Sequence, residues 1–220
     1  MIIDENLEII QKNIASIATD WNRAPNEIKL IAVSKRQPQN KLQSALEAGH
    51  RLFGENRVQE AFEHWQKLKP LYPDLKLHLI GPLQTNKVKE ALKLFDVIET
   101  VDREKLARKI GSEQKSLSHK PTCLIQVNTG EEEQKSGIPP QELPAFLTFC
   151  KDECDLDVQG LMCIPPIDEP ASLHFGLLQK LAQNHNLTEL SMGMSSDYEK
   201  AIPLGATYIR VGTAIFGERT

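Results

Sequence analysis

The stretch that decides the fold is Ile28-Lys29-Leu30-Ile31-Ala32-Val33-Ser34-Lys35. Its run of aliphatic and β-branched residues predicts a strand that is buried on both faces. Pro38 and the helical spacing of Leu42, Ala45 and Leu46 follow directly, so the strand leads at once into a helix. A strand followed by a helix is the repeating unit of an α/β fold.

Lys35 closes this stretch, at a position where α/β folds bind ligands. The carboxyl ends of parallel strands open into the mouth of the fold, and burial there lowers the pKa of a lysine because the ammonium loses water. The resulting neutral amine is able to form a Schiff base with an aldehyde. Taken alone, a lysine at a strand end is more often an ordinary surface group. The case for Lys35 therefore depends on the rest of the chain.

Composition narrows the class of protein. With 220 residues, 40% of them hydrophobic, residues 1–220 are expected to form a single domain around one core. The net charge of −4 and the lack of a basic stripe argue against nucleic acid as a partner. No apolar run approaches the roughly 20 residues of a membrane span, and the N-terminus lacks the basic start of a signal peptide. We therefore expect a cytoplasmic protein that does not bind membranes.

The four cysteines do not form a disulfide framework in a chain of this length. Cys150 and Cys154 are spaced i, i+4, which would suit a metal, but no histidine or second cysteine pair nearby completes a ligand set. We expect reduced thiols and no metal site.

Strand-like and helix-like segments alternate along the whole chain. The strand candidates are Ile28–Ser34, Arg51–Gly54, Leu75–Ile80, Val97–Val101, Thr122–Val127, Asp157–Cys163, Glu189–Met192 and Thr207–Val211. Between them lie amphipathic stripes at i, i+3, i+4, i+7 spacing, as in Val88–Phe95 and Leu143–Cys150. Eight strands with intervening helices predict an α/β fold, a closed (β/α)8 TIM barrel.

An N-terminal helix is expected to complete the ring of helices around this barrel. Only residues 213–220 follow the last strand, too few for a full eighth helix. The apolar stripe that precedes the first strand consists of Leu7, Ile10, Ile14, Ile17, Ala18 and Trp21. A doubly wound open sheet is the alternative, but it usually has fewer strands and leaves this helix without a role.

Segments rich in small residues follow the last two strands. Ser191-Met192-Gly193-Met194-Ser195-Ser196-Asp197 leaves the seventh strand, and Arg210-Val211-Gly212-Thr213 leaves the eighth. Such residues let backbone N–H groups approach an anion, and Ser195 is placed to cap the next helix while it offers a hydroxyl. Ordinary turn chemistry explains either segment alone. Together they predict a phosphate site, which barrels of this kind often build after strands seven and eight.

An amine on strand one and a phosphate site on strands seven and eight predict a phosphorylated aldehyde cofactor. Pyridoxal 5′-phosphate (PLP) is the obvious candidate. Arg210 would then pair with the pyridine nitrogen, donating a hydrogen bond without supplying a proton, because an arginine stays protonated. The cofactor would remain a weak electron sink. A strand-end salt bridge is the alternative role for Arg210.

The motifs of the chain resemble those of the YggS/PROSC family of PLP-binding homeostasis proteins. The resemblance covers nearly the whole chain and is carried by Ala32-Val33-Ser34-Lys35, Phe53-Gly54-Glu55-Asn56-Arg57-Val58-Gln59-Glu60, His78-Leu79-Ile80-Gly81-Pro82-Leu83-Gln84-Thr85-Asn86-Lys87, Val127-Asn128-Thr129, Lys135-Ser136-Gly137, Gly160-Leu161-Met162, Leu190-Ser191-Met192-Gly193-Met194-Ser195 and Arg210-Val211-Gly212-Thr213-Ala214-Ile215-Phe216-Gly217. It implies a fold-type III barrel like the N-terminal domain of alanine racemase.

The resemblance also implies a function and a set of cofactor contacts. Members of the family are thought to control the supply of PLP and, through it, the balance of amino acids and keto acids, without an established turnover. The implied cofactor-binding residues are Lys35, Asn56, His78, Met192, Ser195, Arg210, Gly212 and Thr213. We expect Lys35 to hold PLP as a Schiff base, and apo forms of PLP-dependent enzymes are the candidate partners.

Two enzymatic functions are less well supported by the sequence than a PLP-binding regulator or carrier. A single-domain amino-acid racemase needs a second base opposite Lys35, and in the similar racemases a tyrosine from a second domain supplies it. Tyr72, Tyr198 and Tyr208 are poor substitutes by position. A Schiff-base aldolase acting on a sugar phosphate leaves Arg210 without a role. We therefore expect a PLP-binding regulator or carrier with no catalytic residues, present as a monomer or a weak dimer.

Overall fold

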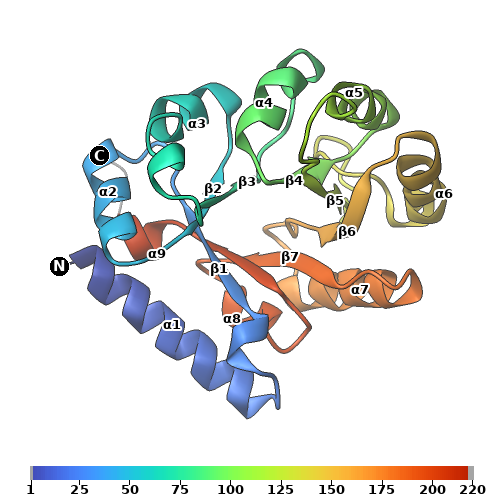
Figure 1. Ribbon diagram of the computed structural model, residues 1–220. Helices are drawn as coiled ribbons and strands as arrows, with labels where there is room; N and C mark the ends of the chain where they lie inside the picture. Colours follow the sequence, from blue (N-terminus) through green and yellow to red (C-terminus); the bar gives the residue numbers. More distant parts are fainter. Residues whose placement is uncertain (1, 218–220) are drawn as a thin grey trace.

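The computed structural model describes residues 2–217, in which parallel strands pair in chain order and the last closes onto the first (Figure 1). The strands are β1 (Lys29–Val33), β2 (Leu52–Glu55), β3 (Lys76–Leu79), β4 (Val97–Val101), β5 (Thr122–Gln126), β6 (Asp157–Met162), β7 (Glu189–Met194) and β8 (Tyr208–Val211). The predicted (β/α)8 barrel is confirmed, and all eight strand candidates are found.

Helices surround the strands (Figure 1). They are α1 (Ile2–Asp20), α2 (Gln39–Glu47), α3 (Val58–Trp65), α4 (Val88–Leu94), α5 (Glu104–Gln114), α6 (Leu143–Thr148), α7 (Ala171–Asn184), α8 (Tyr198–Ala201) and α9 (Thr213–Phe216). Short helical turns join several of them: η1 (Pro25–Glu27), η2 (Lys69–Leu71), η3 (Thr85–Lys87), η4 (Pro140–Glu142) and the π-helical η5 (Phe149–Glu153).

The N-terminal helix α1 occupies the place of the missing eighth outer helix. It packs against α2 and α9, and Asn13 donates a hydrogen bond of 2.7 Å to the hydroxyl of Tyr198 in α8. Asn6 donates to the carbonyl of Ile215 in α9 at 2.9 Å. The predicted role of α1 is thereby confirmed. Trp21 was expected in its apolar stripe, but the helix ends at Asp20 and the Trp21 side chain is 60% exposed.

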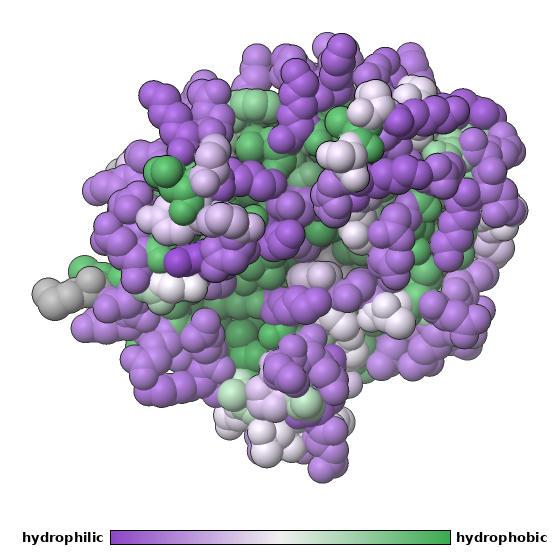
Figure 2. All heavy atoms as spheres, in the orientation of Figure 1, coloured by the Kyte–Doolittle hydropathy of each residue, from purple (hydrophilic) through white to green (hydrophobic). Residues whose placement is uncertain are grey.

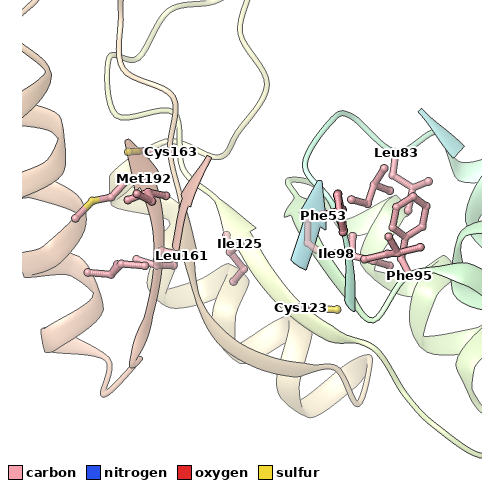
Figure 3. Packing of buried hydrophobic residues seen from close by; sticks show 14 of the residues in the cluster. Phe53, Leu83, Phe95, Ile98, Cys123, Ile125, Leu161, Cys163 and Met192 are labelled. Carbon is pink, nitrogen blue, oxygen red and sulfur yellow. The ribbon is translucent and has the colours of Figure 1, made fainter. Parts of the chain in front are cut away.

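The main core lies between the barrel and its helices. Because strand side chains alternate between two faces, every second strand residue points outward into this layer. Trp65, Phe53 and Phe175 are among the largest fully buried side chains, and a close view of the cluster is given in Figure 3. The inward residues are of a different character, since His78, Arg210 and other polar groups lie among them. The polar groups therefore lie inside the barrel, and most of the hydrophobic core lies between the barrel and its helices.

Hydrophilic residues cover most of the face shown in Figure 2, as the polar outer sides of amphipathic helices predict. Among residues 2–217, no helix has both the length and the apolar character that crossing a membrane requires.

Candidate functional site at the mouth of the barrel

Lys35 lies two residues beyond β1, in a turn that is held from both sides. Ser34 is fully buried, and its hydroxyl donates a hydrogen bond of 2.6 Å to Glu55 Oε1. On the other side, the backbone N–H of Arg36 donates to the carboxylate of Glu60. Arg36 has a φ of 57°, a left-handed conformation that costs energy for a residue other than glycine. The carboxylates of β2 and α3 thus fix the backbone that carries Lys35.

Glu55 is the centre of this support. It is fully buried at the end of β2, and its Oε1 also accepts hydrogen bonds from His64 Nδ1 at 2.8 Å and Trp65 Nε1 at 2.9 Å. Burial opposes the protonation of His64, but the hydrogen bond and the charge of Glu55 outweigh it and raise the pKa of His64. Glu55, Glu60 and His64 bring potential metal-ligating atoms within 4.8 Å of one another. The observed hydrogen bonds assign these groups to holding the Lys35 turn.

A chain of polar groups crosses the barrel interior beneath the mouth. Arg210 of β8 donates from Nη1 to Ser191 Oγ at 2.6 Å, and Ser191 donates to Glu99 Oε2 at 2.6 Å. His78 Nδ1 lies 2.6 Å from Glu99 Oε1. All four side chains are nearly inaccessible to solvent. We call Arg210, Ser191, Glu99 and His78 the buried network.

The donors and acceptors of the buried network are matched. The serine hydroxyl accepts from the guanidinium and donates to the carboxylate, and the carboxylate takes a second hydrogen bond from the Nδ1–H of His78. Glu99 therefore offsets the charge of the buried Arg210 through Ser191. Arg210 also donates from Nη2 to the carbonyl of Cys163 at 2.8 Å. Its guanidinium is thus oriented by two hydrogen bonds and keeps further N–H groups for a ligand.

Asn56 follows β2 directly and is half-buried at the mouth. A close approach of two loops sets its backbone: a Cβ added at Gly81, after β3, would lie 2.3 Å from the Asn56 carbonyl oxygen, so only glycine fits there. The Oδ1 atom of Asn56 is buried and has no hydrogen-bond partner in the described part of the chain. The side chain can therefore accept a hydrogen bond from a ligand.

The loops after β7 and β8 meet at Ser195 and Gly212. The Gly212 N–H and the Ser195 hydroxyl oxygen are 3.4 Å apart, a long contact for a hydrogen bond. Ser195 and Thr213 are both exposed at the mouth. We call Ser195, Gly212 and Thr213, the residues at which the sequence predicts a phosphate site, the phosphate cradle.

The prediction that Ser195 caps the following helix is wrong. Asp197 occupies the N-cap position of α8, with no side-chain cap, and its carboxylate instead accepts a hydrogen bond of 2.6 Å from the Met194 N–H. The strand-to-helix turn depends on Gly193, whose φ is 90° and whose added Cβ would lie 2.7 Å from the Cβ of Ala201. The Ser195 hydroxyl is thereby left at the mouth.

Met192 does not join the other predicted site residues. Ser191 points into the barrel, so its neighbour Met192 points outward. Its side chain is fully buried and belongs to the outer hydrophobic cluster, where Figure 3 shows it together with Leu161 and Cys163. We do not carry Met192 into the proposed site.

Glu99 and Ser191 were not singled out from the sequence. Both are polar residues inside otherwise apolar strands, and Glu99 is the one charged residue in Val97-Ile98-Glu99-Thr100-Val101. A buried carboxylate in a strand requires a partner, so the position of Glu99 among apolar residues indicates a buried polar partner. The partner itself lies 92 residues further along the chain.

A parallel barrel with polar groups at the carboxyl ends of its strands is shared with a known class of protein. Residues 6–220 match the model of the family described as alanine racemase, N-terminal domain. Alanine racemase of Clostridium difficile 630 has a similar barrel, with a TM-score of 0.73 at 17% identity; the match covers 97% of this chain and 57% of the racemase. At that identity the likeness concerns the fold alone.

Nearer relatives define the family more narrowly. The pyridoxal phosphate homeostasis protein of Vibrio cholerae is 42% identical over 228 residues, covering 99% of this chain and 96% of that protein. PipY of Synechococcus elongatus, solved without PLP, is 38% identical with a TM-score of 0.83, covering 98% of this chain and all of PipY. PipY with PLP bound has a TM-score of 0.76 and covers 94% of this chain. The chain belongs to the family of the pyridoxal phosphate homeostasis proteins.

Proposed function

We propose that the protein binds PLP at the mouth of its barrel and acts in intracellular PLP homeostasis, without turning over a substrate. The observation that carries this proposal is the adjacency of β1 and β8. Ala32 pairs with Val211, so Lys35 and the Gly212–Thr213 segment leave neighbouring strands. A Cβ placed on Gly212 would contact Val33 at 3.4 Å. An amine and a phosphate-type site thus stand side by side.

The residues present fit PLP. Phosphate oxygens would accept hydrogen bonds from the Ser195 and Thr213 hydroxyls and from the Gly212 N–H, which makes only a long contact within the protein. The remaining N–H groups of Arg210 would donate to the pyridine nitrogen. Asn56 and His78 would border the cofactor. When bound, PLP supplies an aldehyde for a Schiff base with Lys35 and a ring that can delocalise electrons.

Arg210 would limit the reactivity of the cofactor. Its guanidinium stays protonated and is held by the buried network, so it would donate a hydrogen bond to the ring nitrogen and retain its own proton. A neutral pyridine nitrogen draws electrons weakly. The same contact therefore supports binding and disfavours turnover.

The positions of the tyrosines support a carrier over a racemase. The Tyr208 hydroxyl lies 3.3 Å from Nζ of Lys29, the first residue of β1, which places it at the end of the barrel opposite to the mouth. The Tyr198 hydroxyl accepts a hydrogen bond from Asn13 of α1 on the outside of the barrel. Tyr72 follows η2, ahead of β3. These are the three tyrosines of the sequence, and none stands across from Lys35 as a second base.

The wider cellular role is part of the same proposal. A protein that holds PLP reversibly and does not consume it can deliver the cofactor to apo-enzymes in the cytoplasm. We propose a single domain and a monomer, since packing against α2 and α9 covers the apolar stripe of α1. Sedimentation at micromolar concentration tests the monomer, and a tight dimer would contradict it.

Equilibrium titration with PLP and with pyridoxal tests the binding site. A charge-assisted hydrogen bond contributes about 1.5–3 kcal/mol, so Thr213→Val should weaken PLP binding about 10- to 100-fold. Thr19→Val, which changes an exposed threonine of α1, is the matched control and should bind PLP normally. Pyridoxal should bind far more weakly than PLP. Equal affinity for the two aldehydes would contradict the phosphate cradle.

A screen of amino acids for racemisation, decarboxylation and transamination tests the absence of turnover. Rates of the PLP-loaded protein should stay near those of PLP alone in buffer. Racemisation at ordinary enzymatic rates, on the order of 1–1000 per second, would show that the protein is an enzyme.

A further inference from the structure

A polar cavity lies at the mouth of the barrel, beside the proposed cofactor site. Its volume is ≈ 630 Å³, within the range typical of small-molecule sites. It is formed by the loops after β2, β3, β4 and β5, on the other side of the barrel mouth from the phosphate cradle. The lining residues are Asn56, Arg57, Val58, Gln59, Pro82, Leu83, Gln84, Lys87, Asp102, Arg103 and Ser136. Asn56 alone is shared with the proposed cofactor contacts.

Positive charge predominates in this cavity although the whole chain is acidic. Three cationic side chains, Arg57, Lys87 and Arg103, line it together with one carboxylate, Asp102. Asp102 is already paired with Arg103 at 2.5 Å. The cavity therefore has an excess of positive charge that its own lining does not neutralise.

The three cations differ in how they are held. Arg103 is fixed, because it pairs with Asp102 and donates from Nη2 to the carbonyl of Leu83 at 2.8 Å. Lys87 pairs with Glu90, which lies outside the cavity lining, at 3.1 Å. Arg57 stands immediately before α3 and makes no ion pair or hydrogen bond through its guanidinium within residues 2–217. One oriented guanidinium and one unpaired guanidinium thus border the same space.

We propose that this cavity binds a small dianion, either a dicarboxylate or a phosphate, between Arg57 and Arg103, with Lys87 adding charge. Guanidinium groups match the planar geometry of carboxylates and phosphates and form paired hydrogen bonds to them. The concave shape fits a small molecule. Pro82, which is exposed, provides apolar surface for the carbon part of such a ligand. The site is separate from the phosphate cradle and does not depend on the proposed binding of PLP.

Isothermal titration calorimetry with succinate, and separately with inorganic phosphate, tests this site on protein loaded with one equivalent of PLP and freed of excess PLP. One equivalent of PLP would fill the phosphate cradle, so that added phosphate reports on the cavity. The variants are Arg57→Gln and Arg103→Gln. Arg108→Gln is the matched control, because Arg108 lies on α5, is exposed, and does not line the cavity. Ionic strength is held constant with sodium chloride.

Saturable binding of at least one of the two anions is expected, weakened about 10- to 100-fold by Arg57→Gln and by Arg103→Gln and unchanged by Arg108→Gln. The arm that binds distinguishes a dicarboxylate from a phosphate ligand. Absence of saturable binding in both arms overturns the proposal, as does an equal loss in the Arg108→Gln control. If PLP does not fill the phosphate cradle, inorganic phosphate will show an additional site that survives Arg57→Gln. That result would contradict the proposed function while the succinate arm still decides the cavity.

Discussion

Replacing Glu99 by glutamine should destabilise the protein by about 2–3 kcal/mol. A hydrogen bond to an ionised group contributes about 1.5–3 kcal/mol and a neutral one about 0.5–1.5 kcal/mol. Glu99 accepts two such bonds, both of 2.6 Å, from Ser191 and His78. Removal of the charge weakens both, and it leaves the Arg210 guanidinium buried without its counter-charge, which acts in the same direction.

Urea unfolding of the apo-protein at neutral pH measures this effect. The midpoint of unfolding should fall while the slope m stays unchanged, because the surface exposed on unfolding is the same. For a chain of this size, the loss corresponds to a decrease in Tm of about 4–12 °C. Glu8→Gln, which removes an exposed carboxylate of α1 paired with Lys12, should change stability by less than about 0.5 kcal/mol. If Glu99→Gln is as mild as Glu8→Gln, the buried network does not hold an ionised carboxylate.

Three further predictions concern the surroundings of the site. The pKa of His64 is raised in the folded state, so protonation of His64 stabilises the fold below the ordinary pKa of 6.5, and that contribution is lost as the pH rises through the raised pKa. Urea unfolding should therefore show the stability of the wild type falling relative to His64→Gln between about pH 6 and pH 8. Parallel stability curves for the two proteins would contradict the hydrogen bond to Glu55. Gly193→Ala should lower the free energy of unfolding by at least about 1 kcal/mol more than Gly49→Ala, because both positions have positive φ but only a Cβ at residue 193 meets other atoms within 4 Å. Equal losses of Tm in the two variants would show that the turn after β7 tolerates a side chain. Burial raises the pKa of the Cys163 thiol to about 12, so alkylation followed by mass spectrometry should find this cysteine unmodified in the folded protein and modified after unfolding. Rapid modification of the folded protein would mean that the hydrophobic layer around Cys163 is open to solvent.

The fold could be predicted because each strand and each helix is specified by a short, local segment of the sequence. Short apolar segments alternate with amphipathic helices along the chain, and this alternation is sufficient to indicate a parallel barrel. The N-terminal helix was recognised by the same periodicity. Trp21 was misassigned because periodicity does not tell where a helix ends, and α1 ends one residue earlier.

The site could be predicted only in part, for physical reasons. Gly212 follows β8 directly and Lys35 lies two residues after β1, so the sequence places both at the mouth. The link between Glu99 and Ser191 depends on the spatial meeting of β4 and β7 across the barrel interior, which no local pattern encodes. Met192 enters the predicted site through the family resemblance alone, and its neighbour Ser191, which points into the barrel interior, places it on the outer face.

The central claim is that Lys35 holds PLP at the mouth of the barrel, and borohydride reduction tests it most directly. Reduction of the PLP-loaded protein, followed by proteolysis and mass spectrometry, should place the pyridoxyl group on the peptide that contains Lys35. Lys35→Ala should retain some PLP through the phosphate cradle but fix none of it on reduction. Recovery of the group mainly on Lys29 or Lys87 would contradict the account.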